Sequence, residues 1–223
     1  MFDRIARRYD LLNRVLSAGT DVRWRRACVD LLELRSPARI LDLATGTADL
    51  LVEVLRRDGG HRGVGVDLSE QMLRRAVAKL RRRGLDGRAR LAAGDAESLP
   101  LPSASFDAAM IGFGIRNVAD PGGALAELRR VLRPGGRVVV LEFSLPAGWR
   151  GTVYRRYFHR ILPRIGALVS GDAAAYSYLP ASVERFPAPE AFAALMERAG
   201  FTAVRWRLLT GGIACLHRGE RPS

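Results

Sequence analysis

The chain has 223 residues and a net charge of +13, from 36 Lys and Arg against 23 Asp and Glu. This length suits one α/β domain, so we expect a single domain over residues 1–223, with an N-terminal helical cap at 1–36 and a helical insertion at 145–187. Its two cysteines lie far apart, which argues against a disulfide framework or a metal cluster. The sequence has neither a run of about 20 apolar residues nor an apolar signal core, which predicts a cytoplasmic protein.

The hydrophobic pattern alternates between strand and helix along most of the chain. Helical spacing over residues 2–34 comes first, and regular alternation then begins after Pro37. The expected strands are residues 39–44, 62–69, a segment beginning at 89, 106–114, 137–144, 202–209 and 212–218. The expected helices between them are residues 48–59, 70–84, 119–136 and 189–201. This order predicts an α/β fold with a doubly wound, mainly parallel sheet.

In such a sheet, ligands bind beyond the carboxyl ends of the strands. The first of these ends reads "LDLATGTADL", and its small residues allow backbone amides to approach a ligand. A dinucleotide fingerprint would need a third glycine where Asp49 stands, so a pyrophosphate site is disfavoured. Asp42, Gly46 and Thr47 are therefore candidates for binding another kind of cofactor, and helix capping is the alternative for Asp42, Thr47 and Asp49.

The next two strand ends also carry acidic residues. Asp67 follows the second strand, where a carboxylate can bind ribose hydroxyls; its alternative role as a helix cap is better filled by Ser69. Asp95, followed by Ala96, ends the third strand and can accept from an adenine amino group. Acidic strand ends without a phosphate cradle predict a nucleoside without phosphates, and S-adenosylmethionine fits this description. No cluster of residues has the spacing of metal ligands, so we expect no metal.

Three motifs resemble a known family. Residues 9–24, "YDLLNRVLSAGTDVRW", and residues 130–144, "RVLRPGGRVVVLEFS", are similar to the two signatures of the quinone-biosynthesis C-methyltransferases. Residues 113–118, "FGIRNV", are similar to the motif that this family has beside its methyl-transfer site. The resemblance implies a class I S-adenosylmethionine-dependent methyltransferase, with a Rossmann-like sheet of about seven strands and an antiparallel terminal strand.

The chain departs from the family pattern at Leu12, where Met is usual, at Asp21, where His is usual, and at Arg133, where Lys is common. Gly112 stands where many ubiquinone-type members have a serine that contacts the cofactor. Residues 168–187 look more like the menaquinone branch, so demethylmenaquinol is the favoured substrate and a ubiquinone precursor is the alternative. By resemblance the cofactor contacts are Thr47, Asp67, Asp95 and Ala96.

Arg116 and Asn117 end a strand that is otherwise apolar. Because burying polar side chains without partners is costly, this position indicates a specific role for both. Methylation of a quinol carbon requires an ionised ring hydroxyl, which Arg116 can stabilise while Asn117 orients the quinol oxygens. The alternative for Arg116 is a structural ion pair with Asp120 or Asp10. Tyr9 and Asp10 are candidates to cap the site, with Asp10 as a base; Tyr9 could equally be a core aromatic.

Two rival readings and several partners stay open. The basic charge also fits a membrane-binding or nucleic-acid-binding module on the same scaffold, although no motif for nucleic acid is present and we expect none to bind. A methyltransferase with a soluble phenolic acceptor is the other rival. The basic aromatic residues 149–169 suit an anionic membrane surface, which would place the protein at the inner face of the cell membrane. A homodimer is a further expectation, and His159 and His217 are expected at the surface.

Overall fold

The computed structural model describes residues 17, 19–35, 37–57, 60–146, 148, 151 and 180–223. Tyr9, Asp10, His159 and nearly all of the basic aromatic segment lie outside these ranges, so the predictions made for them are not addressed by the structure. Over the described residues, no helix is both long enough and apolar enough to cross a membrane.

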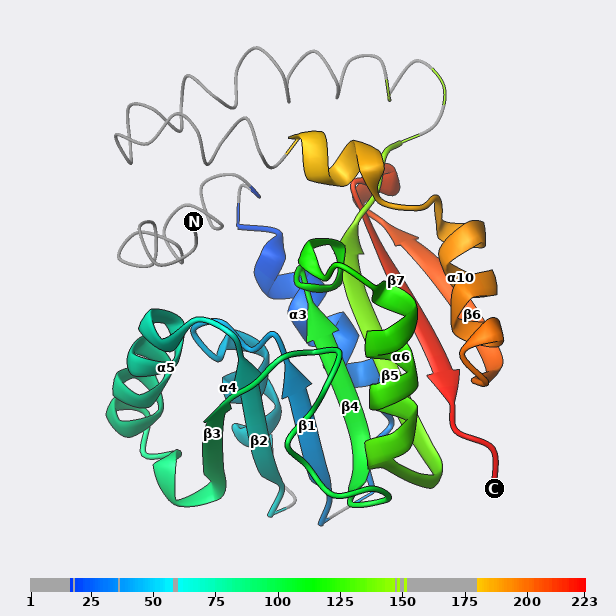
Figure 1. Cartoon of the computed structure of the whole chain (residues 1–223). Helices are drawn as coiled ribbons and strands as arrows, with labels where there is room; N and C mark the ends of the chain where they lie inside the picture. The colour runs from blue at the N-terminus through cyan, green and yellow to red at the C-terminus, as the bar shows by residue number, and fades with distance from the viewer. Residues whose placement is uncertain are drawn as a thin grey trace.

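Seven strands form one sheet in the order β3-β2-β1-β4-β5-β7-β6 (Figure 1). The strands are β1 (Arg39–Leu43), β2 (Arg62–Asp67), β3 (Ala89–Ala93), β4 (Phe106–Gly112), β5 (Leu132–Phe143), β6 (Thr202–Leu209) and β7 (Ala214–Glu220). The first five pair in parallel, whereas β7 runs antiparallel to both β5 and β6. The predicted doubly wound, mainly parallel sheet with an antiparallel terminal strand is confirmed.

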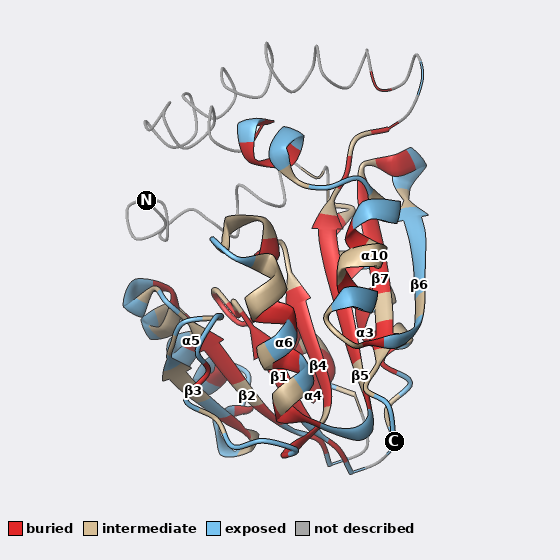
Figure 2. Ribbon diagram, turned by 45° about the vertical axis from the view of Figure 1, so that its right-hand side comes forward, coloured by how far each residue is buried: buried red, intermediate tan, exposed pale blue. Residues whose placement is uncertain are grey.

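Helices cover both faces of the sheet. They are α3 (Asp21–Leu31), α4 (Asp49–Leu55), α5 (Glu70–Arg82), α6 (Pro121–Val131) and α10 (Pro189–Arg198). Apolar residues of α3, α4 and α5 form one core with the sheet, and those of α6 and α10 form a second core on its other face. Figure 2 shows the consequence, because the central strands are buried along most of their length between the two helical layers. Burial on both faces explains why these strands read as continuous apolar runs.

Strand β5 begins earlier than the sequence pattern predicted. Leu132 pairs with Phe106, the chain then leaves the ladder, and regular pairing resumes where Arg137 meets Ala108. The intervening residues 133–136 contain a proline and two glycines. The sequence analysis had placed this whole segment at the end of the preceding helix. A single buried leucine pairing ahead of such a bulge leaves no periodic signal in the sequence.

Candidate active site

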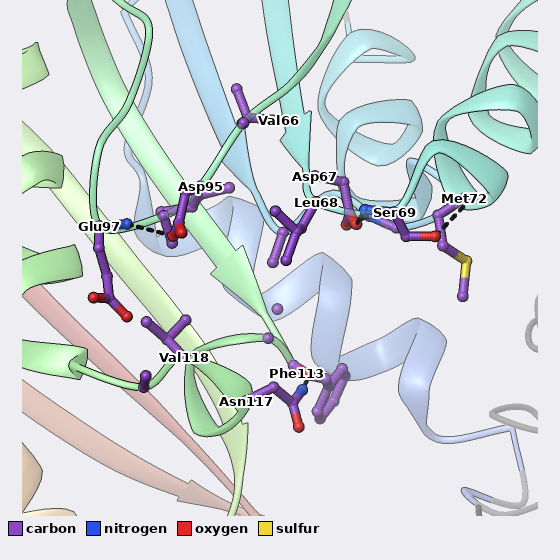
Figure 3. Close-up of a pocket in the computed structure, with 18 residues that line it drawn as sticks. Val66, Asp67, Leu68, Ser69, Met72, Asp95, Glu97, Phe113, Asn117 and Val118 are labelled. Atoms are coloured by element: carbon purple, nitrogen blue, oxygen red, sulfur yellow. Dashed lines mark hydrogen bonds between the residues drawn. The ribbon is translucent and has the colours of Figure 1, made fainter. Parts of the chain in front are cut away.

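A cavity of about 430 Å³ opens at the carboxyl ends of the parallel strands. It is lined by the loops that follow β1, β2, β3 and β4, as predicted from the topology (Figure 3). This volume is typical of small-molecule and cofactor sites. The predicted site residues that line it are Gly46, Asp67, Asp95, Ala96 and Asn117.

Asp67 is held in a fixed orientation at the end of β2. One carboxylate oxygen accepts from the backbone N–H of Gly46 at 2.7 Å, and the other accepts from the backbone N–H of Ser69 at 2.8 Å. Ser69 itself caps α5, because its hydroxyl accepts from the backbone N–H of Met72 at 3.2 Å, as expected from the sequence. The carboxylate of Asp67 therefore faces the cavity with acceptor capacity for a ligand.

The end of the cavity near β3 combines a carboxylate with apolar walls. Asp95 is oriented by the backbone N–H of Glu97, which donates to its Oδ1 at 3.0 Å. Leu68, Met72 and Val118 also line the cavity, and the sequence analysis missed all three. Leu68 is 77% exposed, so it offers apolar surface at the wall of the cavity. Its position directly after Asp67 is the only sequence signal that could have identified it.

The loop after β1 lies against a second, smaller cavity of about 40 Å³. Asp42 is buried at its wall and accepts from the hydroxyl of Thr45 at 2.6 Å. Burial raises the pKa of Asp42 to about 7, although the hydrogen bond from Thr45 opposes that rise. Thr47 also lines this cavity, and its hydroxyl oxygen accepts from Nζ of Lys79 at 2.8 Å. The structure thus places Asp42 and Thr47 beside the main cavity and not among its lining residues.

The capping alternative for this loop holds for Asp42, whose carboxylate accepts from the backbone N–H of Leu51 in the first turn of α4. Ala48, at the N-cap position of α4, adopts a left-handed conformation and offers no side-chain hydrogen bond. Asp49, one of the residues considered for capping, instead forms ion pairs with Lys79 at 2.6 Å and with Arg25 at 3.3 Å. Thr47 and Asp49 therefore both contact α5 through Lys79, and Asp49 also contacts α3 through Arg25.

Arg116 belongs to the loop that follows β4, within the short 3₁₀ helix Ile115–Asn117, and only 6% of its side chain is exposed. Its Nη1 donates to Oε1 of Glu142 and to the backbone carbonyl of Phe113, both at 2.6 Å, and its Nε donates to the hydroxyl of Ser182 at 3.3 Å. Burial raises the pKa of Glu142, and the positive charge of Arg116 opposes that rise. The two residues therefore form a buried ion pair that lines neither cavity.

This arrangement corrects the partner that the sequence analysis named for Arg116. Asp120 does not pair with it: its carboxylate caps α6 by accepting from the backbone N–H of Gly122 at 2.9 Å. The actual partner, Glu142, belongs to the neighbouring strand β5. Asn117 lines the main cavity as expected, whereas the proposed action of Arg116 on a substrate stays a prediction.

His217 is buried, contrary to its predicted place at the surface. Its Nε2 lies 2.9 Å from the carbonyl oxygen of Pro189, and its ring packs edge-on against Phe192. The misprediction arose because its neighbours on β7 are charged, yet β7 lies between two other strands and one of its faces is covered by α10. Within the described ranges, no three His, Cys, Asp or Glu side chains gather in a way that could hold a metal ion.

The sheet order and the cavity at its carboxyl edge define the class I methyltransferase fold. Two solved structures share it: the [4+2]-cyclase SpnF, with a TM-score of 0.75 and 20% identity over 100% of this chain and 94% of that one, and a putative methyltransferase from Bacillus halodurans, with a TM-score of 0.67 and 17% identity over 89% and 99%. At these identities the likeness concerns the fold alone.

The chain belongs to the ubiE/COQ5 methyltransferase family, which matches residues 1–221. It is 55% identical to the "Demethylmenaquinone methyltransferase" of Thermus thermophilus over the whole of both chains. It is 53% identical to the "Ubiquinone/menaquinone biosynthesis C-methyltransferase UbiE" of Syntrophotalea carbinolica, over 99% of this chain and 92% of that protein. The predicted family and the predicted enzyme class, a methyltransferase, are both confirmed.

Proposed function

We propose that this protein transfers a methyl group from S-adenosylmethionine to a ring carbon of demethylmenaquinol, as a step of menaquinone biosynthesis. The observation that carries the proposal is the 55% identity, over the full length of both chains, to a protein named for this activity. A relative at 52% identity over 99% of this chain, from Deinococcus radiodurans, has the same name. The menaquinone branch is thereby favoured over the ubiquinone branch.

The residues of the main cavity suit S-adenosylmethionine, which supplies an electrophilic methyl group on a sulfonium. Asp67 would accept from the ribose hydroxyls, because both of its oxygens are already oriented by backbone N–H groups. Asp95 would accept from the adenine amino group, and Leu68 offers an apolar surface to the adenine ring. These contacts account for the nucleoside part of the cofactor.

The quinol would occupy the side of the cavity nearest the loop after β4. Its ring carbon becomes nucleophilic when a ring hydroxyl loses its proton, so a fixed positive charge nearby would favour the reactive form. Arg116 would supply that charge through water, because its guanidinium pairs with Glu142 and does not line the cavity, and Asn117 would orient the quinol oxygens from the cavity wall. Tyr9 and Asp10 keep their proposed roles as a cap over the site and as a base.

The decisive experiment measures which acceptor is methylated. The protein is incubated with isotopically labelled S-adenosylmethionine and, in separate reactions, with reduced demethylmenaquinone, a reduced ubiquinone precursor and a soluble phenol, and the products are identified by mass spectrometry. We expect label on the ring of menaquinol. Methylation of the ubiquinone precursor alone would move the protein to the other branch, and labelling of none of the three acceptors would contradict the proposal.

A prenylated quinol resides in the bilayer, so the enzyme must reach it from the membrane surface. We propose that this cytoplasmic protein binds the inner face of the cell membrane through residues 149–169, whose aromatic and basic side chains suit anionic headgroups. The protein should co-sediment with anionic vesicles and not with neutral ones, and changing Arg155, Arg156 and Arg160 to Gln should reduce the bound fraction. Equal sedimentation with both vesicles would contradict this part. A homodimer, the remaining proposed partner, is tested by sedimentation velocity.

A further inference from the structure

The small cavity beside the loop after β1 adjoins the main cavity. The two share four lining residues, namely Ala44, Gly46, Gly112 and Phe113. A volume of about 40 Å³ exceeds the 10–15 Å³ that one water needs, so it can hold a small polar group but no ring. Any ligand that fills the main cavity and ends in a compact polar group could therefore extend into it.

Arg25 forms one wall of the small cavity. It belongs to α3, and its side chain is 10% exposed. Its Nη1 donates to Asp21 and lies 3.3 Å from Oδ2 of Asp49. Because a guanidinium has five N–H donors, Arg25 can bind a further acceptor while keeping these two partners. Asp21 stands where the family signature usually has His, and in this chain it holds Arg25 in place.

Arg25 and Asp49 line the small cavity and lie 3.3 Å apart. Behind them, Asp21 pairs with Arg25 and Lys79 pairs with Asp49. The carboxyl of Asp42 lies at another wall of the same cavity. A site with a cation at one wall and a carboxyl at another complements a zwitterion, since neither end of the ligand is left buried without an opposite charge.

The placement of the nucleoside determines which end of the cofactor reaches this cavity. Asp67 and Asp95 would hold the ribose and the adenine at the ends of β2 and β3, so the amino-acid end would point toward the ends of β1 and β4 (Figure 3). The small cavity lies there, between Gly46 and Gly112. Building a Cβ on Gly112 would bring it within 2.5 Å of Leu50, so this wall is closed by the packing of α4 against the strand end.

From this arrangement we infer that Arg25 binds the α-carboxylate of the amino-acid end of S-adenosylmethionine, within the small cavity. The inference rests on the proposed function, because it assumes that the nucleoside occupies the main cavity. The alternative is that Arg25 only ties α3 to α4 through Asp49. That role would affect every ligand of the cavity alike, whereas a carboxylate contact affects only ligands that carry the carboxylate.

The test compares two ligands by calorimetry. S-adenosylhomocysteine contains the amino-acid end, and 5′-methylthioadenosine has the same nucleoside and sulfur without it. In the Arg25→Gln variant, we expect the affinity for S-adenosylhomocysteine to fall about tenfold or more, because a hydrogen bond between two charged groups is lost. The affinity for 5′-methylthioadenosine should change by less than about twofold.

Arg57→Gln is the matched control. Arg57 also ties α4 to α3, through a 2.7 Å ion pair with Asp30 and a 3.1 Å hydrogen bond to the carbonyl of Arg26, but it lines neither cavity. It should leave the affinities for both ligands unchanged. If Arg25→Gln weakens both ligands equally, or weakens neither, Arg25 is a structural residue and the inference is wrong.

A further variant covers the case in which Arg25→Gln does not fold. Arg25→Lys keeps the charge beside Asp21 and Asp49 but loses the planar fork, so it should weaken S-adenosylhomocysteine several-fold and leave 5′-methylthioadenosine unaffected. Unchanged affinity for both ligands in that variant would overturn the inference. The proposed function fails separately, by a different result: absence of binding of S-adenosylhomocysteine to the unaltered protein.

Discussion

The loops after β2 and β4 leave the same edge of the sheet, yet their charged side chains have different surroundings. Asp67, after β2, turns its carboxylate toward the cavity and is oriented by two backbone N–H groups. Arg116, after β4, turns its guanidinium away from the cavity wall toward Glu142 on the neighbouring strand. One loop places its charge at the cavity, and the other pairs its charge with a carboxylate within the protein.

The difference follows from what surrounds each loop. The carboxylate of Asp67 lines the cavity and accepts from the backbone N–H groups of Gly46 and Ser69. Arg116 is almost fully buried, and so is Glu142, so each requires the other. The loop after β2 therefore has its acidic side chain at the cavity, where the proposed ligand would bind. In the loop after β4, Arg116 pairs with Glu142 and is also proposed to stabilise the phenolate of the substrate. Four experiments test the roles of these loops and of the strand between them.

The largest expected effect is on stability, from Glu142→Gln. This change leaves the guanidinium of Arg116 buried without its counter-charge, which typically costs about 3–5 kcal/mol. Urea unfolding should show the loss as a lower midpoint. Arg133→Gln is the control, because it breaks an exposed pair with Asp107 and should cost at most about 1 kcal/mol. Equal losses of unfolding free energy in the two variants would mean that the buried pair contributes no more to stability than the exposed one.

The next effect concerns turnover in Arg116→Lys. Lysine keeps a positive charge beside Glu142 but cannot reproduce the guanidinium geometry, so stabilisation of the phenolate should suffer most. We expect kcat to fall about a hundredfold, with the affinity for S-adenosylhomocysteine nearly unchanged. Steady-state kinetics and calorimetry measure the two quantities. A parallel fall in both would show that Arg116 acts only by holding the loop.

A smaller loss is expected for ligand binding in Asp67→Ala. Removing the carboxylate takes away a charged acceptor for the ribose hydroxyls, and such a bond typically contributes about 1.5–3 kcal/mol. The affinity for S-adenosylmethionine should therefore fall roughly tenfold or more by calorimetry. Asp86→Ala, in the exposed turn before β3, is the control and should bind normally. Unaltered affinity in the Asp67 variant would remove that residue from the site.

The smallest effect is a pH dependence of the free energy of unfolding. It is expected from Asp42 on β1, the strand that lies between β2 and β4. Because its pKa rises from 3.8 to about 7 on folding, the folded protein binds more protons than the unfolded chain between these values, and stability falls as the pH rises toward and through 7. The Asp42→Asn substitution removes the contribution of Asp42 to the pH dependence of stability. Between pH 5 and pH 8, unfolding free energies should show the wild type losing on the order of 2 kcal/mol more than the variant. Identical pH profiles would contradict the raised pKa.

The sequence by itself determined which strand ends form the site and which of their residues meet there. Apolar runs alternating with amphipathic helices require a parallel sheet, and parallel strands end at one edge, so Asp67 and Asp95 had to converge. Local chemistry was also readable: Ser69 caps α5 because its hydroxyl lies within reach of a backbone N–H three residues on. Each of these inferences depends on neighbours along the chain or on the topology alone.

Only the tertiary structure decided how the buried charges are paired. Glu142 is 26 residues from Arg116, and Asp49 is 24 residues from Arg25, so nothing in the local sequence links either pair. His217 shows the same limit, because its burial depends on β7 lying between β5 and β6. The sequence shows which side chains are charged, but the packing of separate elements determines which charged side chains pair. The small cavity beside Arg25 exists for that reason, since α3, α4 and the ends of β1 and β4 enclose it together.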